Sequence, residues 1–128
     1  MTPAAYMRKS EQALSSARQL LATGDADGAC NRAYYAMFDA AQAALLAANV
    51  GAAANATKTH RGLISAFGQH LVLGGRVAAD LGSALNKVER LRLLADYTGD
   101  PVSEEDGAWA VEQAAVFVAA IRAAFDLT

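Results

Sequence analysis

The sequence predicts an all-α protein, an up-and-down bundle of about five helices. About a quarter of its 128 residues are alanine, the strongest helix former, and only two are proline. Apolar residues recur at helical spacing along most of the chain, and no segment alternates convincingly in the manner of a strand. The length suits one domain, which we expect to occupy residues 1–128.

The first two helices have clear start signals. Thr2 can cap a first helix, and a proline follows at the first helical position, where a missing N–H costs nothing. Asp25 or Asp27 can cap a second helix, which we expect to run to about Val50. The small and polar stretch 51–58 is expected to be a loop.

Three further helices complete the prediction. Thr59 can cap a third helix that runs to about His70, before a Gly-Gly pair. A fourth runs from about Val77 to Tyr97, where Thr-Gly-Asp-Pro signals a turn. The fifth ends near Asp126 and is apolar nearly all round, so we expect it to be buried on more than one side.

Composition limits the classes of function. A formal net charge of −2 argues against a protein that coats nucleic acid, although it leaves room for a local cationic cleft. A lone Cys30 cannot form an internal disulfide, and metal-binding Cys/His spacings are absent. The uncharged run 40–57 is rich in Ala rather than Leu or Ile, and no signal-peptide core follows the N-terminus. We therefore expect a cytoplasmic protein with no metal, no cofactor and no membrane association.

Polar residues flank one face of the second helix. Arg32 and Asp39 lie two turns apart on the same side, and Tyr35 flanks them. We interpret Arg32 and Asp39 as a structural pair between packed helices, with a binding role as the alternative. The alanines on that side permit close approach of another helix, and with the excess of apolar helix they suggest a homodimer. These alanines are Ala29, Ala33, Ala36 and Ala40.

A charged residue also falls within the apolar stripe of the fourth helix. This residue is Arg92, and Asp96 lies one turn later at the edge of the stripe. A charge on a core stripe needs a partner or a hydrated cleft. One interpretation is an i,i+4 ion pair that holds the end of the bundle. The other is a cleft in which the planar guanidinium binds anions.

Three segments resemble one branch of the HEPN family (higher eukaryotes and prokaryotes nucleotide-binding domains). Residues 31–38 read Asn-Arg-Ala-Tyr-Tyr-Ala-Met-Phe, which is the distinctive segment. Residues 58–64 read Lys-Thr-His-Arg-Gly-Leu-Ile, and residues 92–97 read Arg-Leu-Leu-Ala-Asp-Tyr. Their order and spacing match the family along nearly the whole chain.

The resemblance implies a compact up-and-down helical bundle, usually a homodimer. Members of this branch are commonly encoded beside a minimal nucleotidyltransferase, and many such pairs resemble toxin–antitoxin modules. Toxic HEPN proteins are metal-independent endoribonucleases whose signature is an Arg, four to six residues, and then a His. In some pairs the nucleotidyltransferase silences the toxin by adding nucleotide to a Tyr just past that His, which suggests Tyr97 as a modification site.

This sequence departs from the catalytic signature. After Arg92 the His would fall at residues 97–99, which are Tyr-Thr-Gly, and neither histidine has an Arg at the required distance before it. Metal-free RNA cleavage needs one group to deprotonate the 2′-hydroxyl and another to protonate the leaving oxygen, and a histidine near neutrality can do either. Asp96 can act only as a base unless burial raises its pKa, so His60 is the replacement acid that the sequence offers.

We therefore expect the helical partner of a nucleotidyltransferase, binding RNA or nucleotide in a cleft around Arg92. The alternative is a metal-independent endoribonuclease toxin with a degenerate active site, and a third reading is a helical dimer with no ligand. The candidate catalytic residues are Arg92, Asp96 and His60. The candidate binding residues are Arg32, Tyr35, Arg92 and Tyr97.

Overall fold

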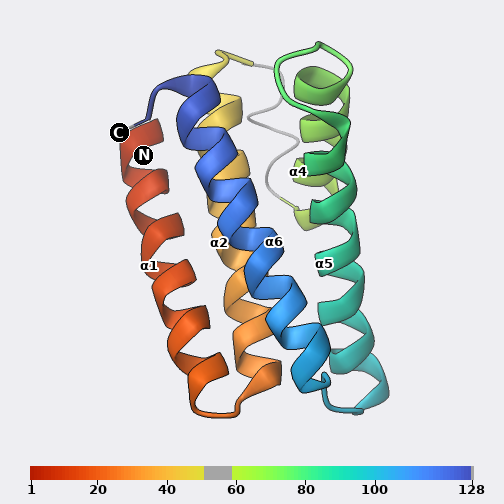
Figure 1. Ribbon diagram of the computed structural model, residues 1–128. Helices are drawn as coiled ribbons and strands as arrows, with labels where there is room; N and C mark the ends of the chain where they lie inside the picture. The colour runs from red at the N-terminus through yellow and green to blue at the C-terminus, as the bar shows by residue number, and fades with distance from the viewer. Residues whose placement is uncertain (51–58, 128) are drawn as a thin grey trace.

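The computed structural model describes residues 1–50 and 59–127, where all regular structure is helical. The elements are α1 (Pro3–Ala22), α2 (Ala26–Ala47), α4 (His60–Ala66), the π-helix η1 (Phe67–Val72), α5 (Ala79–Thr98) and α6 (Glu104–Phe125). The long helices α1, α2, α5 and α6 alternate in direction, with α4 and η1 beside α5, and both chain ends lie at the same end of the bundle (Figure 1). Over these residues the prediction of an all-α bundle of about five helices is confirmed.

Short polar side chains start α1, α2, α4 and α6, because they satisfy backbone N–H groups that have no partner within the first turn, whereas α5 begins without such a cap. Thr2 and Thr59 cap α1 and α4 as predicted. Of the two candidates for α2, Asp25 is the cap. Asp27 instead accepts a hydrogen bond from the backbone N–H of Val102, and so ties the start of α2 to the segment before α6.

Helix α2 lies at the centre of the bundle, where it packs against α1, α4, α5 and α6. Its alanine face is fully buried by the chain's own helices. On the α1 side, the hydroxyl of Ser10 donates a hydrogen bond of 2.6 Å to the carbonyl of Ala36, an approach that the small residues permit. The prediction that this face receives another helix is confirmed, but that helix belongs to the same chain, so the face no longer argues for a homodimer.

The observed boundaries differ from the predicted ones at three places. Helix α2 ends at Ala47 rather than Val50, and α5 begins at Ala79 rather than Val77. The predicted third helix divides into α4 and η1, where the amide of Leu73 bonds to the carbonyl five residues earlier. The predicted loop at 51–58 lies outside the described residues.

Helix α6 buries one face only, so the prediction of burial on more than one side is wrong for the single chain. The buried residues are Gly107, Ala110, Val111, Ala114, Phe117, Val118 and Ile121. The opposite face exposes Trp109 and Val116, which are 38% and 52% exposed. Within the described residues, α6 is the one helix with the length and mean hydropathy of a membrane span, a property that core helices of soluble proteins share.

Candidate functional site

Four aromatic rings form one cluster between α2 and the start of α4. Tyr34, Tyr35 and Phe38 come from α2, at the i, i+1 and i+4 positions of the distinctive segment. The His60 ring stacks on Tyr34 with ring centroids 5.6 Å apart, and it lies 5.7 Å from Tyr35 and 4.8 Å from Phe38. This aromatic cluster (Tyr34, Tyr35, Phe38 and His60) joins two of the three segments that the sequence singled out.

Arg92 of α5 brings the third segment to the aromatic cluster. The central carbon of its guanidinium lies 4.6 Å from the centre of the Tyr34 ring and 5.8 Å from that of Tyr35, in cation–π contact. Its side chain is 13% exposed, and its Nε is buried with no hydrogen-bond partner among the described residues. The Arg92–Asp96 ion pair is long, at 3.4 Å, and Asp96 is 59% exposed. The guanidinium therefore rests mainly on aromatic rings, and only its Nη1 nitrogen contacts Asp96.

A buried carboxylate lies beneath the aromatic cluster. Glu89, one turn before Arg92 on α5, is only 4% exposed. Its Oε2 accepts a hydrogen bond of 3.3 Å from the hydroxyl of Tyr34, and its Oε1 lies 3.5 Å from the guanidinium of Arg61. The Tyr34 hydroxyl also lies 2.8 Å from Nδ1 of His60. A continuous chain of polar contacts thus joins α2, α4 and α5.

Burial shifts two pKa values in this polar chain. The pKa of Tyr34 is raised, first by desolvation and then by the negative charge of Glu89, with Arg92 acting in the opposite direction. The pKa of His60 is lowered, first by desolvation and then by the positive charge of Arg92, with Glu89 opposing. Both shifts favour the neutral form, so the phenol keeps its proton and the imidazole is uncharged at neutral pH.

Arg32 contacts the Tyr35 ring and borders a hollow that residues of α1 also line. Its guanidinium carbon is 5.1 Å from the centre of the Tyr35 ring. Among the described residues Arg32 forms no ion pair with Asp39, so that predicted structural pair is wrong. Arg32, Tyr35, Asp39 and Lys9 instead line a hollow of about 390 Å³ between α1 and α2. Burial raises the pKa of Asp39, and the nearby charges of Lys9 and Arg32 act in the opposite direction.

The remaining predicted residue, Tyr97, lies apart from the rings. It is 84% exposed and lines a second hollow of about 280 Å³ with Arg61 and Glu89. The structure therefore brings Arg92, His60 and Tyr35 into contact within one cluster. It places Arg32 at one edge of that cluster and Tyr97 in a different hollow.

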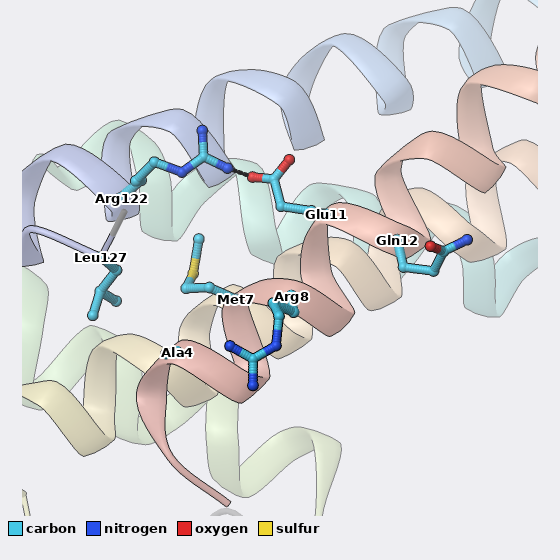
Figure 2. Close-up of a pocket in the computed structure, with 7 residues that line it drawn as sticks. All are labelled: Ala4, Met7, Arg8, Glu11, Gln12, Arg122 and Leu127. Carbon is cyan, nitrogen blue, oxygen red and sulfur yellow. Dashed lines mark ion pairs between the residues drawn. The ribbon is translucent and has the colours of Figure 1, made fainter.

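A further cavity, of about 470 Å³, lies between α1 and α6. Figure 2 shows Arg122 and Glu11 facing each other across it as an ion pair, with Met7 and Leu127 nearby. None of the predicted site residues lines this cavity. We regard it as the crevice between two packed helices, in which Arg122 and Glu11 neutralise each other's charge.

The arrangement is that of a helical domain with a cluster of aromatic and cationic side chains, and the comparisons with known proteins identify its family. A model of the HEPN domain matches residues 4–124. The chain is 40% identical over 114 residues to a UPF0332 protein of Gloeobacter violaceus, covering 88% of this chain and 86% of that protein. It is 35% identical over 120 residues to a Methanocaldococcus jannaschii protein named as a candidate toxin, covering 94% and 86%. It is 32% identical over 101 residues to a UPF0332 protein of Thermotoga maritima, covering 79% and 72%. The chain belongs to the HEPN domain family.

Two contributors to the site were not predicted from the sequence. Glu89 stands in the charged run Lys-Val-Glu-Arg, which resembles a solvated helix face, and Arg61 follows a helix cap. The position of Glu89 could have identified it as a site residue, because it lies one residue after buried Val88 and one turn before Arg92. Tyr34 lies fully in the core, where Glu89 accepts a hydrogen bond from its hydroxyl.

Proposed function

We propose that this HEPN protein is the helical partner of a nucleotidyltransferase in a toxin–antitoxin-like pair, and that it binds RNA or a nucleotide at the aromatic cluster. Arg92 and Arg32 contact phosphate, and the Tyr35 ring offers a surface against which a base can stack. The M. jannaschii relative, named as a candidate toxin, supports the toxin-like assignment.

The observation that carries the proposal is the environment of Arg92. A guanidinium with a purely structural role would be expected to form short, well-aligned ion pairs through its N–H groups. Arg92 instead has one long contact to an exposed carboxylate, and its Nε has no partner among the described residues. Arg32 and Arg61 border the same cluster, so cations gather here in a chain whose net charge is −2. That concentration of positive charge favours a phosphate.

The binding proposal is tested with a fluorescent RNA oligonucleotide and the Arg92→Ala variant. Because charge-assisted hydrogen bonds contribute about 1.5–3 kcal/mol, we expect Kd to rise by about tenfold or more. Arg92→Lys should also weaken binding, since Lys lacks the planar fork of donors. Arg18→Ala is the matched control, because it removes an exposed arginine of α1 that forms no ion pair or cation–π contact with the cluster among the residues that the structure describes. Equal loss in both alanine variants would contradict a specific role for Arg92.

The proposed partners are a second copy of the chain and the nucleotidyltransferase. Apolar side chains that remain exposed on α5 and α6, Leu94, Trp109 and Val116, give a homodimer surface to bury. Light scattering at micromolar concentration checks the dimer, and a monomeric mass would contradict it.

The exposed phenol of Tyr97 is accessible to a nucleotidyltransferase, and mass spectrometry after incubation with that enzyme and ATP tests the modification. We place the pair in the cytoplasm, where the single free thiol of Cys30 is compatible with a reducing environment.

A second candidate function is metal-independent cleavage of RNA. It is favoured by one observation: His60 and Arg92, which are far apart in sequence, contact the same Tyr34 and Tyr35 rings. An acid–base group and a charge-stabilising guanidinium therefore lie at one site, as phosphoryl chemistry requires. Cleavage of total RNA in EDTA should then be lost in His60→Ala and Arg92→Ala but retained in His70→Ala. Absence of cleavage by the wild type would leave the binding function alone.

A further inference from the structure

The polar chain Glu89–Tyr34–His60 determines where its protons lie. Its three side chains come from α5, α2 and α4, and Tyr34 is the fully buried link between the other two. A phenol has a single proton, so Tyr34 can donate to only one of its two neighbours. The other neighbour must donate to the phenolic oxygen or oppose it with a lone pair.

The buried carboxylate resolves this choice. A carboxylate only accepts hydrogen bonds, and both oxygens of Glu89 are directed to donors, Tyr34 and Arg61. The Tyr34 proton therefore points toward Oε2 of Glu89. Its oxygen is left as an acceptor 2.8 Å from Nδ1 of His60, so this nitrogen must carry a hydrogen. The opposite arrangement would set two unshared oxygen lone pairs 3.3 Å apart in a buried site.

We infer that Glu89 and Tyr34 are positioning residues that hold His60 in its Nδ1–H tautomer, so that Nε2 is the nitrogen left with a free lone pair. This inference rests on the proposed function for its meaning, since an acceptor nitrogen at the edge of the aromatic cluster suits a hydroxyl donor. When a phosphate occupies Arg92, the ribose 2′-hydroxyl is the donor that distinguishes RNA from DNA. The Nε2 of His60 would accept from it.

Titratable and charged groups face His60 from three helices. Tyr34 and Tyr35 face it from α2, Glu89 and Arg92 approach from α5, and Arg61 follows it on α4. Arg92 and burial favour the neutral ring, which has one hydrogen to place. The hydrogen-bonded phenol then decides which of the two nitrogens receives it.

Long-range ¹⁵N–¹H NMR of histidine side chains tests the inference directly. In the wild type at neutral pH, we expect His60 to show a protonated Nδ1 and an unprotonated Nε2. In Tyr34→Phe the ring packing is kept but the acceptor oxygen is lost, so His60 should shift to the Nε2–H tautomer that free histidine prefers in water. Glu89→Gln should produce a mixture of tautomers, because an amide can donate to the phenol as well as accept from it.

Tyr35→Phe is the matched control, since Tyr35 contacts the edge of the His60 ring without a hydrogen bond to it. It should leave the His60 spectrum unchanged, and His70 provides an internal reference. An Nε2–H tautomer in the wild type would overturn the inference, as would an unaltered tautomer in folded Tyr34→Phe. Equal Kd values for RNA and DNA of the same sequence would overturn the assignment to the 2′-hydroxyl. Failure of all RNA binding would instead refute the proposed function and leave the tautomer measurement valid.

Discussion

At the scale of single residues, Cys30 is packed as a small apolar side chain. It is 1% exposed, and desolvation raises its pKa to about 11, with Arg92 the main opposing charge. Because the thiolate is the nucleophile, the native protein should react with iodoacetamide at about pH 8 at least tenfold more slowly than the urea-unfolded chain. Mass spectrometry of timed samples measures both rates. Rapid labelling of the native protein would show that the thiol is accessible and contradict this prediction.

The sequence predicted those site residues whose type is unusual for their position in a helix or a motif. Arg92 is a charge on an apolar stripe, and His60 lies within a recognisable segment, so both could be singled out. Their contact with the same two rings could not, since it depends on how α2, α4 and α5 pack. The predicted Arg32–Asp39 pair failed for a similar reason: helical periodicity placed both residues on one side, but the nearby Tyr35 ring offers Arg32 a cation–π contact instead.

At the scale of elements, the close approach of α6 to α2 depends on Gly107. A Cβ atom at this position would lie 3.0 Å from the Cβ of Ala26 and 3.2 Å from its Cα, closer than packed carbons normally come. We expect Gly107→Val to lower the free energy of unfolding by about 1–3 kcal/mol, because the two helices must separate. Urea titration followed by circular dichroism measures the change.

The neighbouring substitution Ala108→Val provides the control for Gly107. Residue 108 is exposed on the same turn of α6, so this change tests only the weaker helix propensity of valine. We expect a loss of about 0.5 kcal/mol. Valine is a better helix former than glycine, so only the contact with Ala26 can destabilise Gly107→Val. A Gly107→Val variant no less stable than Ala108→Val would contradict that tight contact.

Helix starts were predicted more accurately than helix ends and interiors. Thr2, Asp25 and Thr59 cap their helices through local bonds to backbone N–H groups three residues ahead, which sequence spacing reveals. The π-helix at 67–72 was not predicted, because six residues are too few to distinguish its period from that of an α-helix. The exposed face of α6 was missed because, between residues 114 and 121, its residues are as apolar as the buried ones.

At the scale of the whole molecule, folding places His60 where it is harder to protonate. In the unfolded chain a histidine titrates near pH 6.5, whereas the pKa of His60 is lowered in the fold by burial and by Arg92, against the opposing effect of Glu89. Between those two pKa values the unfolded state binds more protons. The contribution to stability is therefore complete above about pH 6.5 and is lost as the pH falls through the lowered folded-state value.

This linkage predicts a pH-dependent free energy of unfolding that belongs to one histidine. Urea unfolding at about pH 8 and about pH 5.5 should show the wild type losing stability at the lower pH. His60→Gln should lose less between the same two conditions, because the titrating group is gone, while His70→Gln should behave as the wild type does. Carboxylates titrate in all three proteins, so their effect cancels in the comparison. Since His60 is held by helices α2, α4 and α5 together, an equal pH dependence in all three proteins would mean that these helices do not enclose its ring in solution.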